Sequence, residues 1–122
     1  MAKPTFKILS YIKSFSYAID GLSYVIRNHA SFTVQSIAAL FAVSLGFIVK
    51  LERLEWVIIL SVIFAVLVAE LLNTSIETSL DYMAKEHHID VKIGKDVAAG
   101  AVFLTSIGSV FIGLIIFLPY FL

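Results

Sequence analysis

Three apolar stretches, each long enough to cross a bilayer as a helix, occupy most of this chain of 122 residues. They cover about residues 31–50, 55–83 and 96–118. A hydrocarbon core of about 30 Å needs about 20 such residues, and a helix satisfies its own backbone hydrogen bonds there. Hydrophobic residues make up 60% of the chain, more than a water-soluble domain of this size can bury. The sequence therefore predicts an all-α integral membrane protein with a single domain over residues 1–122.

The segment from about residue 5 to residue 28 has the pattern of an amphipathic helix. Its apolar residues recur at alternating spacings of four and three and so share one helical face: Ile8, Ile12, Phe15, Ile19, Leu22 and Ile26. No uncharged run in this segment is long enough to span, so we expect the helix to lie along the membrane surface. Packing on the rest of the protein is the alternative, and both arrangements can hold at once.

Charge predicts the orientation and narrows the classes of partner. Lysine and arginine are concentrated in the N-terminal segment and in the second connection, from Lys85 to Asp96, whereas the first connection carries only Lys50 and Arg53. The N-terminus and the second connection, which we expect to be a loop, should therefore be cytoplasmic. Net charge is zero, which argues against nucleic acid as a partner. Cysteine is absent, which excludes thiolate chemistry.

Polar residues interrupt the second apolar stretch at Glu70, Asn73, Glu77 and Asp81, which we call the acidic stripe. At about 100° per residue these four positions fall within a sector roughly 80° wide. At a rise of 1.5 Å per residue the stripe is about 16 Å long. Acidic side chains inside a membrane helix are costly and usually functional, and they are poor groups for holding helices together. A water-soluble charged ligand could meet a lipid-borne one along this stripe.

The third stretch carries two further signals. A small residue recurs at every fourth position, at Ala101, Thr105, Ser109 and Gly113, a pattern that favours close contact between membrane helices. Pro119 follows the last apolar run and predicts the end of the helix. Glu52, Arg53 and Glu55, in the first connection, have the composition of an exposed turn.

The acidic stripe and the residues after it resemble the bacterial diacylglycerol kinase family, which includes the undecaprenol kinases. The resemblance covers nearly the whole chain without gaps and rests on these segments: Glu70-x-x-Asn73-Thr74-Ser75-Ile76-Glu77-x-x-x-Asp81, Glu86-x-His88, and Lys95-Asp96-x-x-Ala99-Gly100-Ala101-Val102. It implies a homotrimeric enzyme of the bacterial inner (cytoplasmic) membrane, with active sites shared between subunits on the cytoplasmic side. Such an enzyme transfers the γ-phosphate of ATP to a lipid hydroxyl with Mg²⁺, or with Mn²⁺ as the alternative metal.

The resemblance also implies a role for each matching residue. Glu70 corresponds to the catalytic carboxylate, proposed as the base for the lipid hydroxyl, and Asn73 orients the phosphate or the base. Glu77 corresponds to a metal ligand, and a carboxylate oxygen suits Mg²⁺. The positions that match those used around the nucleotide are Tyr17, Glu77, Asp81, Glu86, His88, Lys95 and Asp96. For Glu86 and His88, simple solvation is the competing interpretation.

Two questions follow from the resemblance. His29 stands where the family usually has a second metal-binding glutamate, and imidazole is a poorer ligand for a hard cation than a carboxylate. Either the metal is bound through Glu77 and phosphates with assistance from His29, or the chain is slow, shifted in its metal preference, or catalytically inactive. The segments 98–102 and 113–119 resemble undecaprenol kinases more than diacylglycerol kinases. We therefore expect undecaprenol as the acceptor, with diacylglycerol as the alternative.

Overall fold

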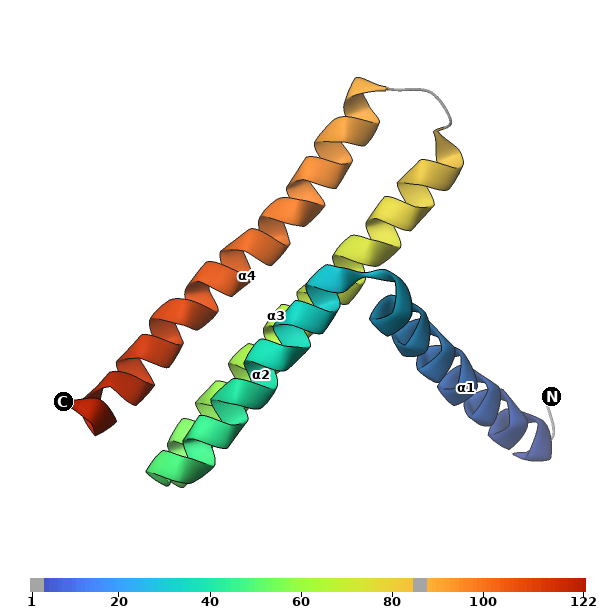
Figure 1. Ribbon diagram of the computed structural model, residues 1–122. Coiled ribbons are helices and arrows are strands. Elements are labelled where there is room, and N and C mark those ends of the chain that lie inside the picture. Colours follow the sequence, from blue (N-terminus) through green and yellow to red (C-terminus); the bar gives the residue numbers. More distant parts are fainter. Residues whose placement is uncertain (1–3, 85–87) are drawn as a thin grey trace. The chain divides into compact units, whose positions relative to one another are not determined.

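The computed structural model describes residues 4–84 and 88–122, and these form four α-helices (Figure 1). The helices are α1 (Pro4–Asn28), α2 (Ala30–Val49), α3 (Arg53–Met83) and α4 (Ile89–Phe121). Helices α2, α3 and α4 are each long and apolar enough to cross a membrane. The prediction of an all-α membrane protein with three spans is confirmed. The chain forms two compact units, residues 1–30 and residues 31–122, which are described separately below.

Helix α1 makes up most of the first unit. Its apolar side chains are largely exposed, among them Phe15 and Ile19, while Val25 is buried. Arg27 lies in the last turn, where a cation interacts favourably with the helix dipole. The helical hydrogen-bond pattern extends to His29, whose N–H donates to the carbonyl of Val25 at 2.9 Å. That this helix lies on the membrane surface stays a prediction.

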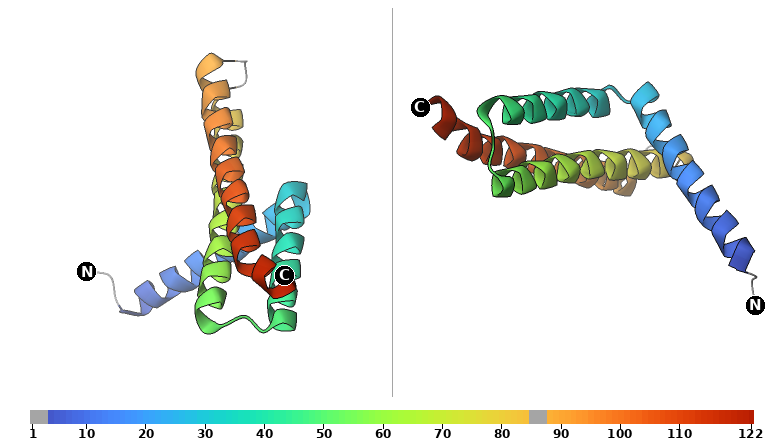
Figure 2. Two further views of the ribbon diagram at one scale, coloured as in Figure 1. Left: turned by 90° about the vertical axis from the view of Figure 1, so that its left-hand side faces the viewer. Right: turned by 90° about the horizontal axis from the view of Figure 1, so that it is seen from below.

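Helices α3 and α4 form the main antiparallel pair of the second unit (Figure 2). The small-residue face predicted on α4 lies partly toward its neighbours, because Ser109 and Gly113 line a cavity between α4, α2 and α3. Ala101 is exposed, so this part of the pattern is not buried against another helix of the second unit.

The connection between α2 and α3 is closely packed. Lys50 adopts the left-handed conformation with φ of 59°, and the N–H of Leu51 donates to the carbonyl of Gly46 at 3.1 Å. The ring of Trp56 lies 4.8 Å from that of Phe47, measured between centroids. A buried cluster of Leu51, Ile59 and Ile116 then joins the turn to the end of α4, and we call this region the packed end.

Helix α3 begins slightly earlier than predicted. We expected an exposed turn at Glu52, Arg53 and Glu55, but the helix already includes Arg53. The backbone N–H of Glu52 donates to Oε2 of Glu55 at 2.9 Å. This contact satisfies one of the backbone donors that a helix N-terminus leaves free, and it therefore favours helix formation before the apolar run begins.

The predicted loop from Lys85 to Asp96 is wrong for its second half, because α4 already begins at Ile89. His88 precedes the helix, and its Nδ1 accepts a hydrogen bond from the N–H of Asp90 at 3.1 Å. Asp90 lies in the first turn, where a negative charge is favourable. An i,i+4 ion pair between Lys92 and Asp96, at 2.6 Å, stabilises the following turn. Polar residues can therefore extend a membrane helix beyond the apolar stretch.

The predicted helix end at Pro119 is also wrong, because α4 continues to Phe121. Proline removes one backbone donor, but near a helix end few hydrogen bonds remain to be lost. The N–H of Leu122 still donates to the carbonyl of Leu118 at 3.1 Å. A proline in the last turn therefore does not stop this helix.

Candidate functional site

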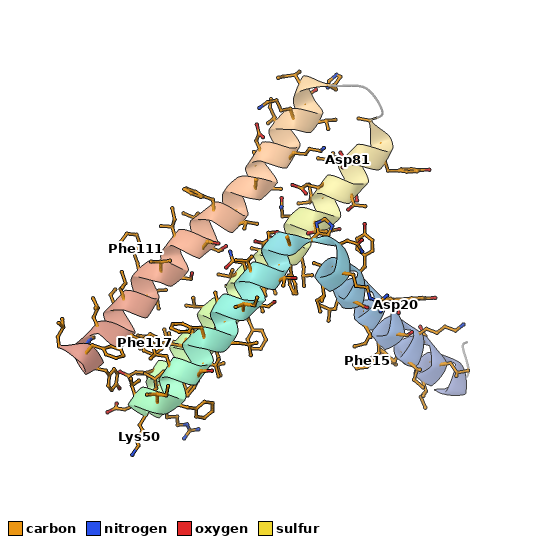
Figure 3. All side chains as sticks on the ribbon, in the orientation of Figure 1. Phe15, Asp20, Lys50, Asp81, Phe111 and Phe117 are labelled. Atoms are coloured by element: carbon orange, nitrogen blue, oxygen red, sulfur yellow. The ribbon has the colours of Figure 1, made fainter. Side chains whose placement is uncertain are left out.

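The acidic stripe runs along α3 from a buried to an exposed environment. The side chain of Glu70 is nearly inaccessible, since the residue is only 3% exposed. Asn73 and Glu77 are half-buried, and Asp81 is exposed at the end of α3 near α4 (Figure 3). A reactive group can therefore be shielded at one end of the stripe while a soluble ligand approaches the other.

Glu70 is held by contacts from two directions. The hydroxyl of Ser31, in the first turn of α2, donates to Oε2 of Glu70 at 3.2 Å. Within α3 the buried hydroxyl of Thr74 donates to the backbone carbonyl of Glu70 at 3.0 Å. A buried carboxylate is costly without such partners, and the Ser31 contact also restricts its rotamer. The sequence alone did not indicate Ser31, because nothing in it pairs a residue of α2 with one of α3.

Asn73 and Glu77 form a second pair, one turn apart. Nδ2 of Asn73 donates to Oε1 of Glu77 over a long 3.4 Å. Within the described part of the chain, Oδ1 of Asn73 is buried and accepts no hydrogen bond. An unpaired buried acceptor costs free energy, so it marks a position where a ligand donor or a cation would be favourable.

The oxygens of Asn73 and Glu77 suit a hard divalent cation, which prefers carboxylate and amide oxygens. Among residues 4–84 and 88–122, however, no three or more His, Asp or Glu side chains gather closely enough to hold a metal by themselves. These donors fit Mg²⁺ only as part of a ligand set that substrate phosphates or further residues complete. His29 belongs to the first unit, where its ring lies 5.9 Å from that of Tyr24.

Two ion pairs surround the exposed end of the stripe. Lys95 on α4 pairs with Asp81 on α3, and Lys92 pairs with Asp96. The side chain of Lys95 is 37% exposed, so its ammonium group remains accessible to a soluble anion. The structure thus brings Asp81 and Lys95 together, as residues of one predicted site should be. Lys92, which the sequence did not indicate, holds Asp96.

Gly94 allows α4 to approach α3 beside this ion pair. A Cβ atom at position 94 would lie only 3.0 Å from Cδ1 of Leu80. A side chain at this position would require the flexible end of Leu80 to shift by a few tenths of an ångström. The role of this glycine depends on the facing helix, so the sequence did not reveal it.

Three predicted site residues remain: His88, Tyr17 and Glu86. His88 is exposed and uses Nδ1 to cap α4, 3.7 Å from a carboxylate oxygen of Asp90. Tyr17 is an exposed residue of α1, in the first unit. Glu86 lies outside the described residues.

Comparison with known proteins identifies the class. A model of the prokaryotic diacylglycerol kinase family matches residues 16–117. The undecaprenol kinase of Bacillus subtilis (strain 168) is 40% identical over 109 residues, which cover 89% of each chain. The diacylglycerol kinase of Synechocystis sp. (strain ATCC 27184 / PCC 6803 / Kazusa) is 32% identical over 107 residues, 87% of this chain and 61% of the relative. The diacylglycerol kinase of Escherichia coli (strain K12) is 29% identical over 110 residues, 90% of each chain.

The chain therefore belongs to the prokaryotic diacylglycerol kinase family. It is a membrane-embedded lipid kinase, an enzyme that uses ATP and acts on a lipid substrate. The predictions of a lipid kinase and of this family are confirmed.

Proposed function

We propose that this lipid kinase transfers the γ-phosphate of ATP to the hydroxyl of undecaprenol and so makes undecaprenyl phosphate. The observation that carries the proposal is the 40% identity to an undecaprenol kinase over 89% of both chains. Identity to the diacylglycerol kinases named above is 32% and 29%. Diacylglycerol, which would give phosphatidic acid, is the alternative acceptor.

In the proposed reaction, Glu70 accepts the proton of the lipid hydroxyl while the hydroxyl oxygen attacks the γ-phosphorus. The bond from that phosphorus to the β-phosphate oxygen breaks, and ADP leaves. The buried position of Glu70 and its contact with Ser31 support this role, because both limit competition from water and fix the carboxylate. Asn73, whose Oδ1 accepts no hydrogen bond within the described residues, orients the lipid hydroxyl or the phosphate.

The proposed nucleotide site lies at the exposed end of the acidic stripe. Lys95 neutralises phosphate charge, and Asp96 accepts hydrogen bonds from the ribose or adenine. Asp81 holds Lys95 in place. Tyr17, Glu86 and His88 complete this group by resemblance to the family.

The proposed metal ligands are Glu77 and Asn73, with assistance from His29. When bound, Mg²⁺ supplies positive charge that neutralises the transferring phosphate. His29 can be tested directly: if imidazole is a limiting ligand, His29→Glu should raise the rate several-fold and lower the Mg²⁺ concentration needed. An unchanged rate in an active protein would show that His29 is not a metal ligand. If the wild type shows no turnover and His29→Glu restores it, the chain is a catalytically inactive relative.

We further propose a homotrimer in the bacterial inner membrane, with α1 on the membrane surface and the active sites on the cytoplasmic side. The incomplete ligand set around Asn73 and Glu77 supports sites completed by a neighbouring subunit. Mixing Glu70→Gln with Lys95→Ala subunits tests the sharing. Recovered activity would place the two residues on different chains of one site, and no recovery would place them on one chain.

The acceptor is tested by transfer of labelled phosphate from ATP to undecaprenol and to dioleoylglycerol, in detergent micelles with Mg²⁺ or Mn²⁺. The proposal predicts a higher kcat/KM for undecaprenol. A preference for dioleoylglycerol would reverse the choice of acceptor, and no transfer to either lipid in folded protein would favour an inactive relative.

A further inference from the structure

The second unit contains an apolar cavity of about 110 Å³ among α2, α3 and α4. Small side chains form two of its walls, since Ala39 and Ala42 lie on α2 and Gly113 lies on α4. Ile59 and Ile63 of α3 and Phe117 of α4 are among its larger apolar lining residues. We call this cavity the interhelical groove.

The groove ends about one helical turn from the proposed reaction centre on two helices. On α3, Val66 lines the groove and precedes the buried Glu70 by one helical turn, a rise of about 6 Å. On α2, Gln35 lines the groove and follows Ser31 by one turn. The hydroxyl of Ser31 donates to Glu70, so this hydrogen bond lies at one end of the groove.

Two polar side chains along the groove have hydrogen-bond partners within the chain. Nε2 of Gln35 donates to the hydroxyl of Ser106 at 3.0 Å, and the hydroxyl of Ser109 donates to the carbonyl of Ser106 at 2.6 Å. Beyond these residues the lining is alanine, glycine, aliphatic and aromatic. A ligand in this part of the groove must therefore be apolar.

The far end of the groove meets the packed end of the unit. Ile59 and Ile116 are buried there, and Phe117 packs against their cluster. The groove thus leads from a buried carboxylate to a region closed by apolar side chains. This arrangement fits a molecule with one reactive polar terminus and a hydrocarbon chain.

The size of the groove limits what it can hold. An engineered apolar cavity of about 150 Å³ in another protein stays dry and binds benzene. A volume of about 110 Å³ therefore suits a segment of roughly five carbons, comparable to one isoprene unit. No neighbouring atom lies within 4 Å of a Cβ built on Gly113, so the glycine leaves this space open.

We propose that the interhelical groove binds the part of the polyprenyl chain next to the reacting hydroxyl and selects the acceptor by this contact. The inference rests on the proposed function, because it needs a lipid alcohol at Glu70. Binding there positions the hydroxyl beside the carboxylate and excludes water. The rest of a long chain remains in the surrounding lipid.

Filling the groove tests the proposal. Gly113→Leu places a side chain in the cavity, whereas Gly108→Leu makes the same exchange on α4 at a glycine that does not line it and has no neighbour within 4 Å. A pocket contact of one methylene is worth about tenfold or more in discrimination. Gly113→Leu should therefore lower kcat/KM for undecaprenol at least about tenfold. Gly108→Leu should leave it within about threefold, as expected for a site without the contact.

A second test varies the chain length of the acceptor. A five-carbon prenol supplies the single isoprene unit that the groove holds, so Gly113→Leu should lower its kcat/KM, whereas Gly108→Leu should not. Across prenols of 10, 15, 20 and 55 carbons, the ratio of kcat/KM in the wild type to kcat/KM in Gly113→Leu should stay the same, because the added units remain in the surrounding lipid. A defect of Gly113→Leu that is absent with the five-carbon prenol would overturn the proposal.

Two controls separate the possible failures. If the wild type phosphorylates no lipid, the proposed function fails, whereas transfer that is insensitive to Gly113→Leu refutes only the groove. Loss of subunit association in Gly113→Leu alone, detected by cross-linking, would show that a second copy occupies the groove. If Gly113→Leu does not fold, Ala42→Leu fills the groove from α2. A prenol with a photoreactive group on its first isoprene unit that labels the wild type only outside residues 35–42, 59–67 and 109–117 would also contradict the proposal.

Discussion

The two ends of the three-helix unit, marked by Lys50 and Asp81 in Figure 3, are stabilised by different interactions. At the packed end, buried apolar side chains interlock and Gly46 touches Trp56 and Leu51. At the other end, hydrogen bonds and ion pairs replace an apolar core. We call that end, with residues 70–81 and 88–96, the polar end.

The polar end also leaves bonding capacity unused. Oδ1 of Asn73 is buried and, within the described residues, accepts no hydrogen bond, while Asp81 and Lys95 remain partly exposed. Natural proteins usually satisfy buried polar groups, so exceptions are informative. We infer that the packed end supplies stability and that the polar end retains groups for substrates. Substitutions at the two ends should therefore affect different measurements.

Apart from Glu70→Gln, the largest effect should come from Glu77→Gln. If Glu77 binds the metal, its loss should lower kcat at least about 100-fold, because removing even an indirect partner of a metal ligand costs 10–100-fold. Part of this loss should be recovered at high Mg²⁺ or with Mn²⁺ in the transfer assay. Glu52→Gln, at an exposed carboxylate on the opposite end of the unit, is the matched control. Equal rates in the two variants would contradict a metal role for Glu77.

Lys95→Met should weaken nucleotide binding. A charge-assisted contact to phosphate is worth about 1.5–3 kcal/mol, so KM for ATP should rise about tenfold or more. Lys50→Met removes the same charge from an exposed position at the opposite end of the unit and should change KM less than about threefold, because solvent and salt screen so distant a charge. Similar increases in both variants would indicate a general charge effect and no specific phosphate contact.

Ser31→Ala should have a smaller effect, confined to turnover. Loss of one hydrogen bond to a carboxylate is worth about 1 kcal/mol or more, which predicts about a fivefold lower kcat. KM for ATP should not change, because the contact lies at the buried end of the stripe. Ser31→Thr retains the hydroxyl and should restore kcat. A threonine variant as slow as the alanine variant would show that Ser31 acts by packing alone.

Of these substitutions, Gly46→Ala should have the smallest effect on phosphate transfer and the largest effect on stability. Its new Cβ would lie 2.8 Å from Cη2 of Trp56 and 2.9 Å from Cδ1 of Leu51. Such overpacking typically costs about 1–3 kcal/mol of unfolding free energy. At Gly108 nothing lies within 4 Å, so Gly108→Ala should be neutral or stabilising. Thermal unfolding in detergent measures the stability of both variants. If Gly46→Ala lowers kcat without lowering stability, the packed end and the polar end do not have separate roles.

The sequence was sufficient to predict elements that depend on local pattern. The apolar stretches predicted α2 and α3 within a few residues, and the spacing of Glu70 and Glu77 placed them on one stripe. The start of α4 was missed because the capping contact between His88 and Asp90 outweighs the end of the apolar run. The apolar pattern therefore predicted the membrane-crossing part of α4 better than it predicted where the helix begins.

Contacts between separate helices could not be predicted from the sequence. The hydrogen bond from Ser31 to Glu70 spans 39 residues, and Gly94 matters only because Leu80 faces it. The interhelical groove likewise depends on which faces of three helices meet. The resemblance to the family supplied Lys95 and Asp96, whereas their ion-pair partners required the structure.

We propose that the buried end of the acidic stripe carries out phosphoryl transfer to a lipid. The most direct test measures transfer of labelled γ-phosphate from ATP to undecaprenol by the wild type and by Glu70→Gln, with nucleotide binding measured in parallel. A positioned base contributes about 10²–10⁴-fold, so the variant should bind ATP normally and transfer phosphate about 1,000-fold more slowly. Transfer within tenfold of the wild type would contradict the account.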